Sequence, residues 1–245
     1  MISVKNLNVS YEKKQILSNL SFEVNNHLTV LGANGSGKST LAKALCGLLP
    51  FNGEVLLNEK DIKTLDLLER AQNISYIPAT LENFDPYIGV RDFILMGRYV
   101  YKKPYLNYSV EDYEAVDEVL ARLSLEALSN ERISALSSGQ KQLCMIASAL
   151  VQKSKIIIFD EPTANLDPAH SVEISKIIRD LQGEHQSILI THDLNFAQSI
   201  EGEILFLKED KGEYYKDSNT FFELENLHRC YETMFLHSAL GMKYD

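Results

Sequence analysis

The feature that most constrains this chain is a glycine-rich segment, Gly-Ala-Asn-Gly-Ser-Gly-Lys-Ser-Thr, at residues 32–40. It follows a largely apolar stretch, 27–31, and precedes a stretch with apolar residues at helical spacing, 37–49. Glycines let the backbone curl so that several N–H groups point to one centre, and the next helix directs its partial positive charge to the same point. The segment therefore predicts a phosphate-binding loop between a strand and a helix.

The residues of this loop have separate expected roles. Lys38 is expected to contact the β- and γ-phosphates of a nucleotide, and Ser39 to bind Mg²⁺. The candidate cofactor-binding residues here are Gly32, Ala33, Asn34, Gly35, Ser36, Gly37, Lys38, Ser39 and Thr40.

Composition limits the classes of protein that fit. The chain has 245 residues, 45% of them hydrophobic and 24% charged, as in ordinary globular proteins. Its net charge of −10 argues against nucleic-acid or anionic-membrane binding over the whole surface. No apolar run approaches the roughly 18 residues of a membrane span, and the N-terminus lacks the pattern of a signal peptide. We therefore expect a cytosolic protein, with Cys46, Cys144 and Cys230 as buried thiols.

Hydrophobic periodicity predicts an α/β fold with a mostly parallel core sheet. Alternating apolar residues predict strands over 2–9 and 16–24, and helical spacing dominates 90–128. Beyond that region strands and helices alternate, which favours parallel strands covered on both faces. The expected strands there are 155–159 and 187–191, and the expected helices are 138–151, 168–182 and 194–199. We predict one domain, 1–245, with a helical subdomain inserted at about 80–150.

Two acids follow a buried strand. Residues 156–159 are Ile-Ile-Ile-Phe, and Asp160 and Glu161 come next, at the edge of the sheet where α/β proteins bind ligands. Asp160 suits a Mg²⁺ site, and Glu161 suits a base that polarises an attacking water. The alternative is a strand that simply ends in two solvated acids.

His192 occupies the same kind of position after the next apolar strand. A histidine there can donate a hydrogen bond to a γ-phosphate and hold the water and Glu161 in place. Lone histidines are more often structural, which is the alternative for this residue.

A second candidate anion site opens the helix after Leu136. Ser137, Ser138, Gly139 and Gln140 present hydroxyl and N–H groups at a helix N-terminus. They fit a γ-phosphate held by a partner subunit, or they form a plain N-cap.

Together these motifs resemble the ATP-binding subunit of an ABC transporter, over nearly the whole chain and in the order of that family. Residues 32–40 are similar to its Walker A loop, 136–140 to its signature (with Ser138 where glycine is usual) and 156–161 to its Walker B motif. Residues 165–167 resemble its D-loop, and His192 its switch histidine. Tyr11 fits the position on which adenine stacks, although it could be an ordinary strand aromatic.

The resemblance implies a P-loop NTPase fold of the ABC ATPase type with an N-terminal antiparallel β subdomain. It implies a homodimer with two ATP molecules and Mg²⁺ at its interface, each ATP lying between one phosphate loop and the signature of the other copy. It also implies transmembrane permease subunits, a substrate-binding protein acting through them, no nucleic acid, and a location on the inner face of the cell membrane.

The expected cargo follows from similarity alone. Segments 90–99 and 225–231 are similar to those of importers for iron-siderophores, haem and cobalamin. Importers of zinc, manganese or molybdate remain alternatives.

Ala79 departs from the family pattern. A glutamine usually follows the Tyr-x-Pro at 76–78, and its amide contacts Mg²⁺ and the attacking water; a methyl group can do neither. Glu82 and Asn83 are candidate substitutes. If neither residue substitutes for the glutamine, we expect Mg²⁺ binding to persist through Ser39 and Asp160 while the rate of ATP hydrolysis is reduced. Two other functions compete with a transport motor, and neither is coupled to transport. One is a soluble ABC-type ATPase, and the other is a slow nucleotide switch.

Overall fold

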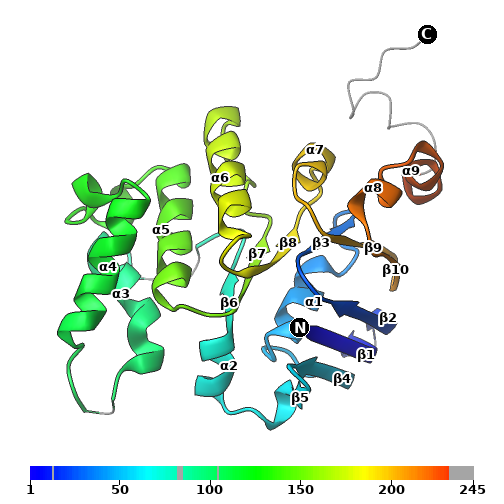
Figure 1. Cartoon of the computed structure of the whole chain (residues 1–245), viewed down its shortest axis with the longest axis horizontal. Coiled ribbons are helices and arrows are strands. Elements are labelled where there is room, and N and C mark those ends of the chain that lie inside the picture. The colour runs from blue at the N-terminus through cyan, green and yellow to red at the C-terminus, as the bar shows by residue number, and fades with distance from the viewer. Residues whose placement is uncertain (13, 82–84, 104, 232–245) are drawn as a thin grey trace. The chain divides into compact units, whose positions relative to one another are not determined.

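The chain contributes three segments to one structural unit and two segments to another. The computed structural model describes residues 1–12, 14–81, 85–103 and 105–231. Unit 1 comprises Met1–Asp66, Ile158–Glu161 and Gln186–Asp245, and unit 2 comprises Leu67–Ile157 and Pro162–His185. Figure 1 labels the elements of each unit.

An antiparallel sheet begins unit 1 and confirms the predicted N-terminal β subdomain. Its strand order is β2 (Lys14–Val24), β1 (Ile2–Tyr11), β4 (Asn52–Leu57) and β5 (Lys60–Asp61). Ile2 pairs with Val24 and Val4 with Phe22, so apolar side chains of both strands point to the buried face.

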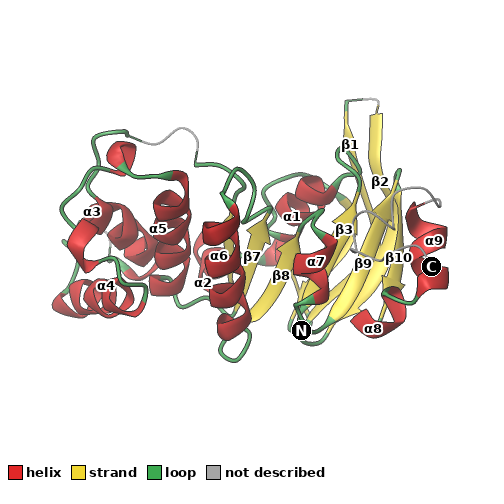
Figure 2. Ribbon diagram, turned by 90° about the horizontal axis from the view of Figure 1, so that it is seen from above, coloured by secondary structure: helices red, strands yellow, loops and turns green. Residues whose placement is uncertain are grey.

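The core sheet of unit 1 is mostly parallel, as predicted. Strand β3 (Leu28–Gly32) lies parallel to both β8 (Gln186–Ile190) and β9 (Glu203–Lys208), and β10 (Lys211–Tyr215) pairs antiparallel with β9. Figure 2 shows these strands side by side. The end of β7 (Ile156–Asp160) continues the sheet beside β8. All five residues of β3 are buried, which explains why the strand is largely apolar.

Helix α1 (Lys38–Leu45) follows the phosphate loop but is shorter than predicted. The predicted stripe included Leu48, whereas Leu48 lies outside the helix and is 58% exposed. Gly47 adopts a left-handed conformation with φ 66°, which ends the helix before Leu48 can join the buried face.

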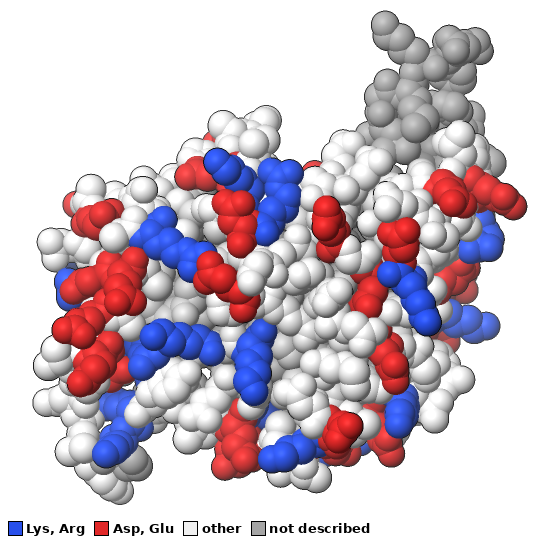
Figure 3. All heavy atoms as spheres, viewed as in Figure 1, with Lys and Arg blue, Asp and Glu red and all other residues white. Residues whose placement is uncertain are grey.

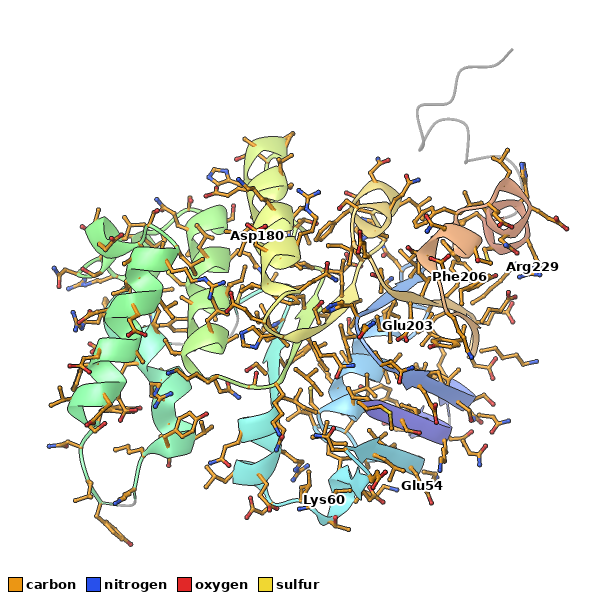
Figure 4. All side chains as sticks on the ribbon, viewed as in Figure 1. Glu54, Lys60, Asp180, Glu203, Phe206 and Arg229 are labelled. Atoms are coloured by element: carbon orange, nitrogen blue, oxygen red, sulfur yellow. The ribbon has the colours of Figure 1, made fainter. Side chains whose placement is uncertain are left out.

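Three short helices complete unit 1: α7 (Leu194–Gln198), α8 (Ser218–Phe221) and α9 (Leu224–Tyr231). They form a buried cluster with β3, β9 and β10 whose members include Leu31, Phe206, Phe221 and Leu227. Phe206 on β9 and Arg229 on α9 are labelled in Figure 4. Because side chains from six elements share this cluster, the C-terminal helices are anchored to the strand that leads into the phosphate loop.

Unit 2 is predominantly helical. Its elements are α2 (Leu67–Asn73), β6 (Ile74–Ile77), α3 (Val90–Leu95), the 3₁₀ helices η2 (Met96–Tyr101), η3 (Glu126–Leu128) and η4 (Ile133–Ala135), α4 (Val110–Arg122), α5 (Ser138–Val151) and α6 (Pro168–Leu181). Helix α5 packs against α3, α4 and η2. The helical run predicted over 90–128 is therefore present, divided into four pieces.

Gly97 allows η2 to approach α5 closely. A Cβ at this position would lie 2.2 Å from the carbonyl oxygen of Ser148, so only glycine fits without moving the backbone. The next residue, Arg98, then reaches across the helices.

Arg98 joins three parts of unit 2 through its guanidinium group. Nε lies 2.7 Å from Oδ1 of Asp112, Nη1 donates to the carbonyl of Val151 at 2.9 Å, and the group lies 4.1 Å from the ring centre of Tyr101. Asp112 also forms a capping box with Ser109 at the start of α4. Burial raises the pKa of Asp112, but the Ser109 N–H and the guanidinium outweigh burial and hold it below its ordinary value.

Two of the three cysteines are buried as predicted, and charged side chains of both signs share the surface. Basic and acidic side chains are interspersed on the face seen in Figure 3. Cys144 and Cys230 are buried free thiols as predicted, whereas Cys46, which follows α1, is only half-buried. No helix in the described part of the chain is long and apolar enough to cross a bilayer.

Replacing Arg98 by methionine should destabilise unit 2 strongly. The substitution leaves the buried Asp112 carboxylate without its cation, which costs about 3–5 kcal/mol of unfolding free energy. Because the folded-state pKa of Asp112 is depressed, its contribution is present above the unfolded pKa of about 4 and is lost as the pH falls through the folded value. Urea unfolding at pH 7 and at acid pH measures both effects.

Arg91→Met is the matched control. Arg91 pairs with Asp117 at 2.7 Å, but both side chains are about half exposed, so its loss should cost no more than about 1 kcal/mol. Equal losses of unfolding free energy in Arg98→Met and Arg91→Met would contradict the stabilising role of the buried Arg98–Asp112 pair.

Candidate functional site

The phosphate loop of unit 1 is held in a conformation that requires glycine. Gly32 ends β3 with φ 152°, and a Cβ there would lie 2.4 Å from the carbonyl oxygen of Leu207 on β9. Gly35 and Gly37 have φ values of 83° and 95°. The sheet therefore presses against the loop from one side, and the left-handed glycines turn the chain sharply into α1.

Lys38 is buried and extends along the inside of this loop. Its Nζ donates to the carbonyl oxygens of Gly32 at 2.9 Å and Ala33 at 3.1 Å, and it lies 3.7 Å from Oε1 of Glu161. The ammonium group is thus fixed at the mouth of the loop by three oxygen atoms. A phosphate oxygen could replace the carboxylate as its anionic partner.

Ser36 supplies an independent sign of ligand binding. Its hydroxyl is buried and has no hydrogen-bond partner among the residues that the structure describes. Burying an unpaired hydroxyl costs free energy, and such groups in native proteins call for an explanation. A phosphate oxygen in the loop would accept the missing bond, so the residues present fit a nucleotide.

Ser39 and Asp160 form an oxygen pair suited to Mg²⁺. The Ser39 hydroxyl, in the first turn of α1, donates to Oδ1 of Asp160 at 3.0 Å, and Asp160 is buried at the end of β7. Mg²⁺ prefers oxygen ligands and is usually held by one or two protein groups together with phosphates and waters. The described residues contain no group of three or more His, Cys, Asp or Glu arranged to hold a metal ion.

Glu161 and His192 meet at the carboxyl edge of the core sheet. Oε2 of Glu161 accepts a hydrogen bond from Nδ1 of His192 at 2.9 Å, while Oε1 faces Lys38. The Glu161 backbone has φ 48° and its N–H donates to the carbonyl of Ile190 at 2.8 Å, which turns its side chain back over the site. A carboxylate held from both sides can orient and deprotonate a water molecule.

The remaining candidates of unit 1 are accessible. Ala33 and Asn34 are exposed, Thr40 is half-buried in α1, and Tyr11 ends β1 with 46% of its surface exposed. A base could stack on the Tyr11 ring, and this role stays a prediction.

The second candidate anion site lies in unit 2 at the start of α5. Ser137 caps the helix: its Oγ accepts from the N–H of Gln140 at 3.2 Å, and its own N–H donates to Oε1 of Gln140 at 3.0 Å. Ser137 and Ser138 are exposed and Gly139 is buried. The expected N-cap is therefore present and accepts from the N–H of Gln140, whereas the N–H groups of Ser138 and Gly139 have no acceptor within the helix.

A cavity of about 200 Å³ adjoins this helix start. It is lined by Ala79, Thr80, Leu81, Ser138, Lys141, Gln142, Met145, Ala164, Asn165 and Leu166. The cavity brings the segment after β6, the start of α5 and the segment 165–167 together within unit 2. Glu82 and Asn83, the predicted substitutes for the missing glutamine, lie outside the described residues.

Sequence reasoning missed two residues of this region. Gln142 is buried, lines the cavity and has no partner for its Nε2 among the described residues. His170, in the first turn of α6, hydrogen-bonds to Asp167. The Asp-x-x-His spacing at a predicted helix start could have indicated the second residue, whereas nothing in the sequence marked Gln142.

Comparison with known proteins places the chain in a family. The family model described as "ABC transporter" matches residues 17–164. An ABC transporter ATP-binding protein of Methanocaldococcus jannaschii is 38% identical over 85% of this chain and 83% of that relative. A "probable iron chelatin transport ATP-binding protein" of Helicobacter pylori is 34% identical over 95% of this chain and 93% of that relative.

Solved structures agree with this placement. A metal-chelate type ABC transporter in an inward-facing conformation matches with TM-score 0.81 and 28% identity, covering 94% of this chain and 88% of that one. An ATP-binding cassette solved as a dimer after hydrolysis, with ADP and Pi, matches with TM-score 0.76 and 25% identity, covering 88% and 98%. With the phosphate loop, the acid pair and the histidine at one sheet edge, these matches identify the chain as a member of the ABC transporter family, with the fold of an ABC ATPase cassette and the ATPase function of an ATP-binding subunit.

Proposed function

We propose that this chain is the ATP-hydrolysing motor subunit of an importer for an iron complex, and that residues 1–245 form one cassette with a helical subdomain at about 80–150. The observation that carries the motor role is the Glu161 carboxylate, fixed between Lys38 and His192. A carboxylate held in this way is oriented to accept a proton from an attacking water.

Each side chain has one task in the proposed reaction. Bound MgATP supplies the phosphoryl group and a divalent cation that neutralises charge on it. The loop N–H groups and Lys38 bind the phosphates, Ser39 and Asp160 hold the metal, and Tyr11 stacks on the base. Glu161 takes the proton of the attacking water. His192, as the imidazolium in which both ring nitrogens carry a proton, donates its second N–H toward the phosphate.

A second copy of the chain completes the site. Ser137, Ser138, Gly139 and Gln140 of one copy bind the nucleotide that lies on the phosphate loop of the other. The dimeric cassette among the structural matches supports this arrangement. Two equivalent sites in one dimer follow from twofold symmetry.

Transmembrane permease subunits hold the dimer on the inner face of the cell membrane, and a substrate-binding protein delivers cargo to them. Iron-chelate transport named for the Helicobacter pylori relative, and metal-chelate transport named for the structural match, support an iron complex as cargo.

Replacing Glu161 by glutamine should lower the Mg²⁺-dependent ATPase rate about 10²- to 10⁴-fold, because the variant keeps the shape of the side chain but cannot accept the proton. Steady-state phosphate release from the purified chain measures it. Glu54→Gln, at an exposed position of β4 labelled in Figure 4, is the matched control and should leave the rate unchanged. Equal rates for wild type and Glu161→Gln would favour a nucleotide switch over a motor.

Replacing Ala79 by glutamine should raise the same rate about tenfold, the effect of one added hydrogen bond of roughly 1–1.5 kcal/mol in the transition state. Ala79 lines the cavity beside α5, so the longer side chain has room. The apparent affinity for Mg²⁺, titrated in parallel, should change little. An unchanged ATPase rate would show that another group already performs the task of the glutamine.

The cargo is tested in cells from which the native copy has been deleted. Reintroducing the wild-type chain should restore accumulation of radiolabelled iron-siderophore, and Glu161→Gln, expressed at the same level, should not. Uptake of labelled zinc and cobalamin is measured alongside. If iron uptake is the same with the wild-type chain and with Glu161→Gln, whereas uptake of zinc or cobalamin is lost with Glu161→Gln, the cargo is zinc or cobalamin instead.

A further inference from the structure

His170 lies directly over Gly139 within unit 2. A Cβ added to Gly139 would lie 2.5 Å from Cδ2 and 2.8 Å from Cγ of the His170 ring. Both distances are shorter than van der Waals contact allows, so only glycine fits beneath the ring. The first turn of α6 therefore rests on the first turn of α5 at a residue of the candidate anion site.

Asp167 holds the ring from its other side. Oδ2 accepts a hydrogen bond from Nδ1 of His170 at 2.6 Å, and Oδ1 caps α6 by accepting from the N–H groups of Ala169 and His170, both at 3.0 Å. The backbone N–H and the ring of His170 lower the pKa of the Asp167 carboxyl, so it is ionised at neutral pH.

The backbone on this side of the contact is also restrained. Pro168 occupies the first turn of α6 and fixes its own φ, and Asn165 adopts a left-handed conformation with φ 62°. The ring therefore transmits the position of segment 165–167 to Gly139 with little freedom between them.

We propose that His170 is a positioning residue for ATP hydrolysis: clamped by Asp167, it sets where the N–H groups at the start of α5 lie relative to segment 165–167. This inference rests on the proposed function, in which those N–H groups bind the phosphate held by a second copy. Misplacement of such groups by about 1 Å can cost on the order of 100-fold in rate.

A set of five variants of the full chain tests the contact: three single changes and two combinations with Gly139→Ala. Gly139→Ala should lower kcat about 10- to 100-fold, because the new methyl group pushes α5 away from the ring. His170→Ala should lower kcat about tenfold, because the helix start loses its support. Combined, the two changes should restore much of the kcat lost by Gly139→Ala, because the added methyl group then occupies space vacated by the ring.

His170→Asn is the matched control. Asparagine retains Cβ and Cγ above Gly139 and carries an amide nitrogen that can reach Asp167, so it should keep most of the wild-type kcat and should not rescue Gly139→Ala. Binding of a fluorescent ATP analogue to the single chain should be unchanged in every variant, because the phosphate loop belongs to unit 1. In a Glu161→Gln background, ATP-dependent dimerisation should weaken in parallel with kcat.

The outcomes separate the inference from the function on which it rests. Suppose that the wild type hydrolyses ATP but His170→Ala leaves kcat unchanged, or that adding His170→Ala to Gly139→Ala does not restore kcat. Either result overturns the positioning role alone. A wild type that shows neither ATPase activity nor ATP-dependent dimerisation overturns the proposed function and the inference together.

Discussion

A buried ammonium group organises the candidate site of unit 1. Lys38 has little access to water, and its charge is compensated by two loop carbonyls and the Glu161 carboxylate. A buried cation without such partners would be strongly destabilising, so the curl of the loop and the backward turn of Glu161 depend on each other. Bound phosphate would offer the same ammonium group a stronger anionic partner. Phosphate binding would then weaken the contact between Lys38 and Glu161.

The polar side chains around Lys38 are hydrogen-bonded to one another in pairs. Ser39 is held by Asp160 and Glu161 by His192, so each group is oriented by a neighbour on a different strand end or helix start. Side chains fixed before the reaction need less reorganisation during it. The unpaired Ser36 hydroxyl is the exception, and it lies in the loop where a ligand can satisfy it.

Paired polar side chains also occur within unit 2. Asp112 caps α4 and binds Arg98, and Asp167 caps α6 and binds His170. In both cases one carboxylate joins the start of a helix to a side chain that reaches a second helix. Close contacts at Gly97 and Gly139 bring α5 within reach of these groups, so α5 is located by two glycines rather than by apolar packing alone.

The sequence by itself determined the phosphate loop, the alternation of strands and helices up to residue 199, the N-cap at Ser137 and the residues that gather at the sheet edge. These follow from local patterns: glycine conformations, strand and helix periods, and polar residues directly after buried strands. Only the tertiary structure decided that α1 ends before Leu48, that Cys46 is half-buried, that Arg98 pairs with Asp112 and that His170 rests on Gly139. Such contacts join segments far apart in the chain, and their distances depend on how helices pack, which no local pattern records.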